Sequence, residues 1–408
     1  MEQLRFIHCA DLHIDSPFKG LDNLPTSLFK EVKQSTFKAL EHLVQTAIKK
    51  RVDFVLMVGD IFDQSTQSVY AQMQFLQACN QLNAYNISVY VSFGNHDYMQ
   101  RDFINMNYPP NVYVFKKEDV TTYIYKKNNH PLVTIHGFSY HSQAVYENKT
   151  SSYNKTTTPY HIGMLHGSVE QHTEHDTYAP FKVQELVNKD FDYWALGHIH
   201  KRQHLKEAPP IIYPGNIQGR SKKEIGEKGC YYVELSKSRT DLTFIPLQSI
   251  RFEQVTINAS ELLTIQSIEK AIMQELNLLT TQGKSFVWVN FEYYTKEVAD
   301  FYYEGMLTDM IDFINEKMVN NNDWIWIESI DLKGHGIIDK ESYRNGEHFL
   351  GEVLKLSQDD EDTDCELDPL WKHPKARKFL HDLTKEEKDE LLEEAENILL
   401  YQLTRKQN

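Results

Sequence analysis

Five short clusters of Asp, His and Asn recur in the first half of this 408-residue chain, each directly after a run of apolar residues. In chain order they are Asp11-x-His13, Gly59-Asp60-x-x-Asp63, Gly94-Asn95-His96-Asp97, His166-Gly167 and Gly197-His198-x-His200. Because polar residues that follow the strands of a sheet can meet at its edge, folding could bring these clusters together. Carboxylate, amide and imidazole groups in this density are the ligands that two neighbouring divalent cations require. The pattern therefore predicts a dinuclear metal hydrolase.

The apolar runs have the length and composition of buried strands, being rich in β-branched, aromatic and large aliphatic residues. They are Leu4–His8, Asp53–Val58, Val89–Phe93, Leu132–His136, His161–Leu165 and Asp192–Leu196. Two stretches with helical spacing of apolar residues, about Ser27–Lys50 and Val69–Leu82, separate the first three runs. This alternation predicts an α/β domain. The runs Gly229–Leu235 and Asp241–Pro246 have no helix between them, so we expect them to form a second sheet packed on the first.

The character of the sequence changes near residue 250. Three strand-like runs alternate from there with two helical patterns, which predicts a small β-α-β-α-β unit. The strands are Phe252–Ile257, Ser285–Tyr294 and Trp324–Ile330, and the helices are about Ser260–Leu279 and Glu297–Val319. The Trp324 and Trp326 side chains suit the core of that unit better than base stacking.

The last part of the chain begins with an acidic run. Seven of the ten residues Asp359–Asp368 are acidic, which is the composition of a solvated linker. Thr384 and Glu387 have the spacing of a capping box before a helix with an apolar side. That side comprises Leu391, Leu392, Ala395, Ile398, Leu399 and Leu403. We therefore expect a first domain over 1–250, a small α/β cap domain over 251–335, an acidic linker region over 336–368 and a helical tail over 369–408.

Charge is distributed unevenly along the chain. The net charge of −15 is unusual for a nucleic-acid-binding protein. Residues 1–250 carry 26 Lys and Arg against 25 Asp and Glu, whereas residues 251–408 carry 17 against 33. The acidity argues against DNA contact by the second half and says little about the half with the clusters. Bound dications would make that first half more positive.

The cysteines and the hydropathy favour a cytoplasmic protein. Cys9, Cys79, Cys230 and Cys365 are widely spaced, with no C-x-x-C pair, so we expect reduced thiols and neither a disulfide frame nor a zinc site. No apolar stretch approaches the roughly 18 residues of a membrane span. The first cluster follows the N-terminal strand so closely that we expect no signal peptide.

Each candidate ligand carries a group that suits a metal. Asp11 and His13 stand two residues apart just past a strand, so both can hold one ion. The Asp60 carboxylate has two oxygens and can bridge two cations, which a histidine cannot do. The other candidates are a neutral amide oxygen and three imidazoles: Asn95, His166, His198 and His200. Spacing alone does not assign these ligands to one ion or the other.

The order D-x-H, G-D-x-x-D, G-N-H-D, H-G, G-H-x-H resembles that of the calcineurin-like metallophosphoesterases, over roughly residues 5–200. The opening Phe6-Ile-His-Cys-Ala-Asp-Leu-His-Ile-Asp-Ser-Pro-Phe18, the small domain and the helical tail are similar to the SbcD-type DNA repair nucleases, and most similar to the bacterial YhaO-type branch. The resemblance implies a four-layer α/β sandwich, in which two β-sheets are flanked by helices, and two divalent metal ions, usually Mn²⁺. It also implies hydroxide attack on a phosphodiester.

The same resemblance implies a role for each site residue. One ion would take Asp11, His13, Asp60 and His200, and the other Asp60, Asn95, His166 and His198. His96 is not needed as a ligand, and we expect it to supply a proton to the leaving oxygen. Asp63 would hydrogen-bond His96 and hold its tautomer, as the equivalent Asp does in related phosphatases.

Two departures from related families bear on the substrate. Certain nucleases of this group carry a histidine where Asp63 stands, and that histidine is linked to exonuclease action. The balance between exonuclease and endonuclease activity is therefore open. The phosphoprotein phosphatases continue G-D-x-x-D-R-G and use the Arg to grip a phosphomonoester. Here Gln64 and Ser65 follow Asp63, which favours a phosphodiester over a protein phosphate.

The resemblance also implies partners. The chain would cut DNA ends as the nuclease subunit of an SbcCD-like repair complex. Its tail would dock on the coiled-coil base of an SbcC-like, YhaN-type ATPase, although packing of the tail on the chain's own body is the alternative. Relatives usually form homodimers. The loop Tyr213–Arg220, with Lys222 and Lys223, could contact DNA phosphates or be a plain turn.

Two other functions stay open. The chain could be a phosphodiesterase for small nucleotides, although a cap domain and a partner-binding tail would be unexpected in such an enzyme. It could instead be a non-catalytic scaffold that holds the ATPase on DNA. The complete ligand set argues against the scaffold, because degenerate family members usually lose a ligand.

Overall fold

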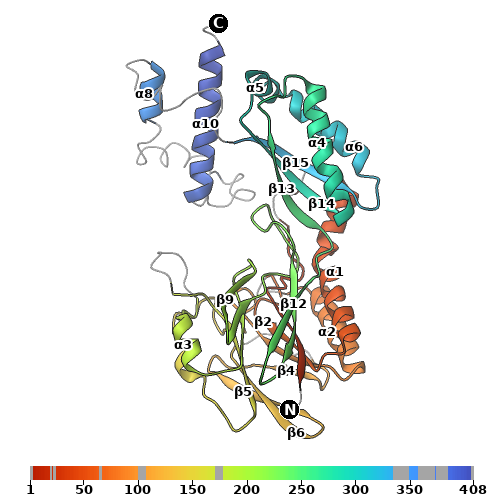
Figure 1. The fold of residues 1–408 in the computed structure, drawn as a ribbon, viewed down its shortest axis with the longest axis vertical. Coiled ribbons are helices and arrows are strands. Elements are labelled where there is room, and N and C mark those ends of the chain that lie inside the picture. Colours follow the sequence, from red (N-terminus) through yellow and green to blue (C-terminus); the bar gives the residue numbers. More distant parts are fainter. Residues whose placement is uncertain are drawn as a thin grey trace. The chain divides into compact units, whose positions relative to one another are not determined.

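The computed structural model describes residues 3–18, 21, 24–63, 67–99, 107–170, 178–333, 349–356, 373 and 385–405 (Figure 1). The chain divides into two compact units. The first comprises Met1–Glu253, Leu279–Phe286 and Asn321–Ile325, and the second Gln254–Leu278, Val287–Asn320 and Trp326–Asn408.

The first sheet of the first unit has six strands among the described residues, in the order β12-β11-β1-β2-β3-β4. Their bounds are Thr240–Pro246, Gly229–Leu235, Leu4–Ala10, Phe54–Val58, Ser88–Ser92 and Val112–Val114. β1 to β4 run parallel, and α1 (Thr26–Lys50) and α2 (Val69–Ala84) connect the first three. Parallel neighbours require such crossover connections, so the predicted alternation of strand and helix is confirmed here.

The second sheet comes from the middle of the sequence. In the described part of the chain its six strands have the order β5-β6-β7-β8-β10-β9. The bounds are Thr121–Lys127, His130–Gly137, Tyr160–His166, Tyr193–Gly197, Pro210–Tyr213 and Gln203–Glu207. The 3₁₀ helix η1 (Thr150–Ser152) precedes β7, and α3 (Val183–Asn188) precedes β8.

The prediction that the runs at 229–235 and 241–246 form the second sheet is wrong. β11 pairs antiparallel with β1, and β12 pairs antiparallel with β11, so both extend the first sheet. β1 has β2 on one side only, and its other edge needs a partner for its backbone groups. A hairpin satisfies that edge without any helix, which is why the sequence shows none between β11 and β12.

Side chains alternate between the two faces of each strand and build separate cores. Phe6 of β1 points toward the second sheet, stacks on Phe54 of the neighbouring β2 at 5.0 Å between ring centroids, and meets Tyr193 of β8 edge-on at 5.2 Å. Ile7 and Cys9 point the other way, into the core under α1 and α2. Another core, around Trp194, lies on the outer face of the second sheet with α3. Two sheets flanked by helices confirm the predicted metallophosphoesterase sandwich.

The strands that precede the clusters end at matched positions. Ala10 pairs with Val58 and Val58 with Ser92 in the first sheet, and His166 pairs with Gly197 in the second. The buried His8 imidazole links the sheets, because it lies 2.9 Å from the Tyr193 hydroxyl and 3.0 Å from the Leu196 carbonyl oxygen. The clusters therefore meet between two sheets, and the expectation of a site at one edge of a single sheet is corrected.

The second unit is built around the strands β13 (Arg251–Asn258), β14 (Ser285–Glu292) and β15 (Ile325–Leu332), which form a sheet in that order. The strands of this sheet are connected by α4 (Ile265–Leu279), α5 (Lys296–Tyr303) and α6 (Met306–Met318), and by the 3₁₀ helix η2 (Thr280–Gln282), which is counted with the first unit. The single helix predicted over 297–319 is in fact two helices. Gly305 has φ 82°, a left-handed conformation that ends α5 and starts α6.

The C-terminal part contains α8 (Phe349–Leu356) and α10 (Lys385–Arg405). The acidic run 359–368 and Thr384 of the predicted capping box lie outside the described residues. In α10, Tyr401 stacks on Tyr303 of α5 at 4.2 Å and donates a hydrogen bond to Asp300 Oδ1 at 2.6 Å. Leu391, Ile398 and Leu399 of the predicted apolar side are 38–44% exposed. The tail thus packs on α5 while part of its apolar side stays uncovered.

Three smaller predictions can be compared with the structure. Trp324 is buried against Phe286, but both residues belong to the first unit, and Trp326 is half-buried. Cys9, Cys79 and Cys230 are free and buried, as expected for reduced thiols. No helix in the described ranges combines the length and the hydropathy of a membrane span.

The aromatic core between the sheets generates a stability prediction. Phe54→Ala should lower the free energy of unfolding of the first unit by about 3–5 kcal/mol, because it removes a fully buried ring and leaves a cavity. Equilibrium urea unfolding followed by fluorescence measures the change. Tyr146→Ala is the control, since Tyr146 is 75% exposed and its loss should change stability by less than about 0.5 kcal/mol. Equal effects of the two variants would contradict the assignment of this core.

Candidate metal centre

The turns after β1, β2 and β8 hold several predicted ligands in an uncommon backbone conformation. φ is 50° at Asp11, 42° at His13, 47° at Asp60 and 100° at His198. A non-glycine residue in such a region costs of the order of 1–3 kcal/mol and persists only where its surroundings enforce it. Here the loops hold each other: the Asp11 amide donates to the Gly59 carbonyl at 3.2 Å, and the His13 amide donates to the Asp60 carbonyl at 3.0 Å.

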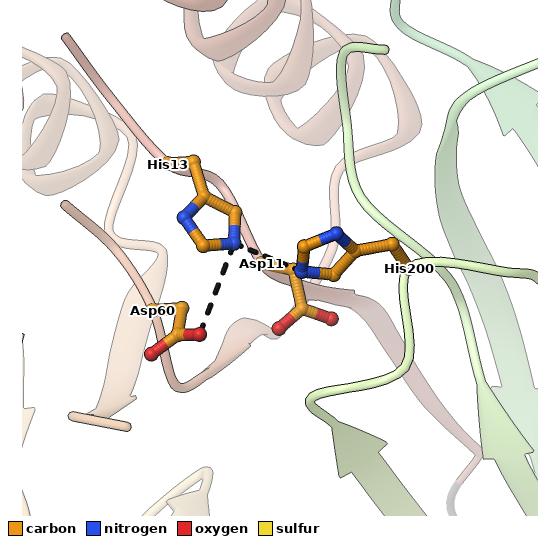
Figure 2. Close-up of side chains that lie close together, drawn as sticks. All are labelled: Asp11, His13, Asp60 and His200. Carbon is orange, nitrogen blue, oxygen red and sulfur yellow. Dashed lines mark hydrogen bonds and ion pairs between the residues drawn. The ribbon is translucent and has the colours of Figure 1, made fainter. Parts of the chain in front are cut away.

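These turns bring together a first group of candidate ligands. The nearest ligand atoms of Asp11, His13, Asp60 and His200 all lie within 4.8 Å of one another (Figure 2). The Nε2 atoms of His13 and His200 are 3.0 Å apart, and His13 Nε2 is 3.8 Å from Asp60 Oδ2. These are the residues that the resemblance assigns to one ion.

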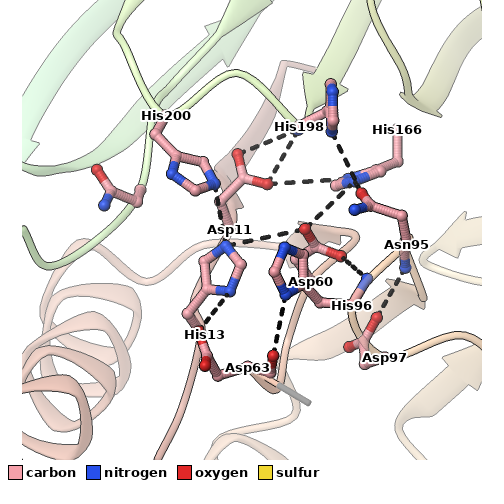
Figure 3. Close-up of polar contacts among 12 residues, drawn as sticks. Asp11, His13, Asp60, Asp63, Asn95, His96, Asp97, His166, His198 and His200 are labelled. Atoms are coloured by element: carbon pink, nitrogen blue, oxygen red, sulfur yellow. Dashed lines mark hydrogen bonds and ion pairs between the residues drawn. The ribbon is translucent and has the colours of Figure 1, made fainter. Parts of the chain in front are cut away.

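A second group lies on the other side of Asp60 (Figure 3). His166 Nε2 is 3.0 Å from Asn95 Oδ1 and 3.5 Å from Asp60 Oδ2. His198 Nδ1 is 3.2 Å from the same Asn95 oxygen. Asp60 therefore contacts both groups, as a bridging carboxylate must. The structure brings all the predicted ligands together, and their assignment as ligands stays a prediction.

The chemistry of the donors fits divalent cations. Burial lowers the pKa of His13 well below its usual value, helped by the charge of Arg220. Burial and the neighbouring His166 lower the pKa of His198 to about 3. These imidazoles are therefore neutral and offer lone pairs, beside the buried carboxylates of Asp11 and Asp60. Electron-pair donors buried this closely are unfavourable unless a cation binds among them, and nitrogen with oxygen suits the divalent transition ions.

The glycines before Asp60 and Asn95 are required by close packing. A Cβ added to Gly94 would lie 2.3 Å from Asp60 Oδ1 and 2.6 Å from His166 Nε2. A Cβ added to Gly59, which has φ 75°, would lie 2.0 Å from His166 Nδ1. The Gly-Asp and Gly-Asn pairs of the sequence thus let a backbone pass directly beside the ligands of another strand.

Asp97 fixes two of the loops to each other. Its buried carboxylate accepts hydrogen bonds from the backbone amides of Ile61 at 2.6 Å, Phe62 at 3.1 Å and Gly94 at 2.8 Å. It joins the turn after β2 to the turn after β3. The sequence interpretation gave Asp97 no role, although its place in the Gly-Asn-His-Asp cluster was a usable signal.

His96 stands at the exposed side of the centre. Its backbone amide donates to Asp60 Oδ1 at 3.0 Å, and its ring meets that of His13 edge-on at 4.9 Å between centroids. Its Nδ1 lies 3.0 Å from the backbone carbonyl oxygen of Asp63. The structure thus contains the predicted hydrogen bond between Asp63 and His96, made by the Asp63 backbone carbonyl oxygen, and the roles of both residues stay predictions. The carboxylate turns instead toward the positive charge of Arg220.

The loop between β10 and β11 supplies residues that the sequence interpretation missed or placed differently. Glu224 lies 2.6 Å from His200 Nδ1. Although burial alone would raise the pKa of Glu224, the hydrogen bond from His200 and the charge of Arg220 hold it well below its usual value. Arg220, predicted to contact DNA, is largely buried between Asp63 and Glu224. Lys222 and Lys223 are exposed. Nothing in the spacing connected Glu224 with a cluster 24 residues earlier.

Comparison with known proteins places this geometry in a family. The calcineurin-like phosphoesterase family matches residues 4–202, which include every predicted ligand. The chain is 33% identical over 406 residues to the uncharacterized metallophosphoesterase YhaO of Bacillus subtilis strain 168, covering 99% of this chain and 98% of that protein.

More distant relatives are DNA double-strand break repair proteins. Identity to the DNA double-strand break repair protein Mre11 of Thermoplasma acidophilum is 27% over 261 residues, covering 60% of this chain and 66% of that protein. Identity to the protein of the same name from Methanocaldococcus jannaschii is 24% over 352 residues, covering 81% and 88%. The similarity to the second of these extends well beyond the residues that contain the clusters.

The close approach at Gly94 generates a prediction about metal binding. Gly94→Ala should lower the affinity for Mn²⁺ by about 10–100-fold, because the added methyl group displaces Asp60 or His166. Isothermal titration calorimetry with Mn²⁺ measures the affinity. Tyr85→Ala is the control, because Tyr85 is 61% exposed and precedes β3, whereas the ligands follow the strands. An unchanged affinity in Gly94→Ala would argue against a metal between these loops.

Proposed function

This chain belongs to the calcineurin-like metallophosphoesterase family, and we propose that it is a two-metal phosphodiesterase that cuts DNA ends. The observation that carries the proposal is the convergence of two ligand groups on Asp60, with the exposed His96 imidazole beside them. Similarity to DNA double-strand break repair proteins over most of the chain supports DNA as the substrate.

The residues of the site would be of two kinds, metal ligands and one proton donor. Asp11, His13 and His200 would hold one ion, Asn95, His166 and His198 the other, and Asp60 both. When bound, two divalent cations, which we propose to be Mn²⁺, would act as Lewis acids that polarise the phosphoryl oxygens and acidify water. Turns that hold their own conformation through hydrogen bonds keep the donors in place before substrate arrives.

His96 is proposed as the general acid. With Nδ1–H donating to the Asp63 carbonyl oxygen, Nε2 is the atom left to give a proton to the leaving oxygen of the cleaved strand. The ring is exposed, so a phosphodiester can reach it without moving the ligands. Asp63 therefore contributes to the position of His96 through its backbone, whereas its carboxylate pairs with Arg220.

The surroundings of the site favour a diester over a monoester. A phosphomonoester dianion needs additional positive charge, which other family members supply with an Arg after the second Asp of G-D-x-x-D. This chain has Gln64 at that position. Arg220 comes close to the ligands from another loop, but both ends of its guanidinium are engaged by carboxylates. A diester, with its single negative charge, matches this arrangement better.

The role of His96 leads to a kinetic prediction. His96→Ala should lower the rate of DNA cleavage by about 10²–10⁴-fold while both Mn²⁺ ions stay bound. Metal binding should survive because Asp60 receives its hydrogen bond from the backbone amide of residue 96, which alanine retains. The rate is measured on end-labelled duplex and hairpin DNA with Mn²⁺, and the metal content by elemental analysis.

Asp60→Ala is the comparison for that experiment, since it should lose both the metal and the activity. A wild-type rate in His96→Ala would remove His96 from the mechanism. Hydrolysis of bis-p-nitrophenyl phosphate by the wild type separates the alternatives. No turnover of this diester would favour the scaffold, and turnover of cyclic nucleotides without cleavage of DNA would favour a small-nucleotide enzyme.

We also propose that the chain acts in the cytoplasm, as a homodimer, within an SbcCD-like repair complex. Val69, Tyr70 and Met73 leave an apolar patch exposed on α2, which would suit contact between subunits. Leu391, Ile398 and Leu399 would meet the coiled-coil base of a YhaN-type ATPase, because apolar side chains uncovered on a helix suit a helical partner.

Charged substitutions on α10 test whether the tail binds the ATPase. The double variant Leu391→Asp/Ile398→Asp should lose binding of the ATPase in a pull-down, because two carboxylates would be buried in an apolar contact. Cleavage of short duplex DNA by the chain alone should stay within about twofold of wild type. Glu393→Ala, on another side of α10, is the control. Retained binding by the double variant would exclude this surface as the docking site.

A further inference from the structure

The three charged side chains of Asp63, Arg220 and Glu224 form a connected group behind the first ligand group. We propose that this group, here called the ligand clamp, orients His13 and His200 and thereby sets the affinity of the ion that they hold. Its members are positioning residues that act through the two imidazoles. The inference rests on the proposed two-metal site and assigns Arg220 to that site and not to DNA.

Glu224 holds one of the imidazoles. Its Oε1 lies 2.6 Å from His200 Nδ1, so the ring donates its Nδ1–H to the carboxylate and keeps the Nε2 lone pair for the metal site. Its Oε2 accepts from the backbone amide of Arg220 at 2.7 Å and from Asn216 Nδ2 at 2.9 Å. Both carboxylate oxygens are therefore held, and the direction of the His200 ring is fixed with them.

Asp63 contacts the other imidazole by charge alone, because His13 Nδ1 makes no hydrogen bond. Its Oδ1 lies 3.2 Å from His13 Nδ1, on the side of the ring away from the site. The Nε2 atoms of His13 and His200 then face each other at 3.0 Å. Each histidine thus has a carboxylate at Nδ1 and presents Nε2 to the same small space.

Arg220 connects the two carboxylates. Its Nη1 pairs with Asp63 Oδ1, and its Nη2 lies 3.3 Å from Glu224 Oε1. A planar guanidinium offers donors in a rigid fork, so one side chain can set the distance between two anions. The side chains of Arg220, Asp63 and Glu224 are only 11–17% exposed. Without the Arg, two carboxylates would repel each other in a poorly solvated place and would pull the histidines out of alignment.

The loop that carries the clamp is itself held in place. Lys228 Nζ donates to the His200 carbonyl oxygen at 3.1 Å, and the Gly226 amide donates to the Phe252 carbonyl oxygen at 2.8 Å. The buried Gln218 accepts from the Ser249 amide at 2.9 Å and donates to the Ile250 carbonyl oxygen at 2.7 Å. Arg220 and Glu224 therefore project from a rigid base, as positioning residues must.

The test is Mn²⁺ binding by the full chain without DNA, measured by calorimetry and by electron paramagnetic resonance of the bound ion. Wild type should bind two ions. Glu224→Gln and Arg220→Met should each lower the affinity for one ion by about 10–100-fold and leave the affinity for the other unchanged. Arg220→Lys should not restore the affinity, because a single ammonium group cannot bridge the two carboxylates. Lys222→Met, which removes an exposed cation from the same loop, should bind both ions as wild type does.

Two results would overturn the clamp. One is wild-type affinity for both ions in Glu224→Gln and in Arg220→Met. The other is a rise in KM for DNA in Arg220→Met with metal affinity unchanged, which would make Arg220 a phosphate contact. Asp63→Asn should weaken binding of the same ion. Because asparagine has nearly the shape of aspartate, this variant is the least prone to misfold. Circular dichroism checks the folding of all the variants. If the variants lose one ion as expected but wild type does not cleave DNA, the proposed function fails and the clamp stands.

Discussion

Two carboxylates, those of Asp11 and Asp60, are buried where adjacent parallel strands end, and the site is organised around them. Negative charge in an interior from which water is excluded must be balanced by positive charge or by many hydrogen bonds. The chain places imidazoles, an amide and backbone amides around the two acids. The left-handed turns and the glycines without side-chain bulk are what allow donors from five separate loops to approach so closely.

This arrangement opposes stability, and other parts of the fold offset it. Strained turns and buried acids each lower the free energy of unfolding. Favourable packing in the surrounding structure must offset this loss. The aromatic contacts between the sheets and the apolar core beneath α1 and α2 provide that packing close to the strand ends. His8 links the sheets from within, close to the ends of β1 and β8, whose turns carry ligands. Binding of metal would then recover part of the cost.

The loop between β10 and β11 has a special position because it connects the two sheets. His13 follows a strand of the first sheet and His200 a strand of the second, so a residue that orients both must come from a segment that reaches both. Arg220 and Glu224 lie in such a segment. The same loop is hydrogen-bonded to the residues at which β13 begins. The precision of the site therefore depends on a part of the chain that contains none of the five clusters.

The sequence by itself determined the features that depend on neighbouring residues. Apolar runs predicted the strands, helical spacing predicted α1 and α2, and the types of side chain after each strand predicted a metal site, because ligand chemistry is a property of the residue. Only the tertiary structure decided which edge β11 takes, that the Asp63 carboxylate faces Arg220 157 residues away, and that Glu224 supports His200. Such contacts follow from how strands pair and loops meet in space, and no local pattern in the chain records them.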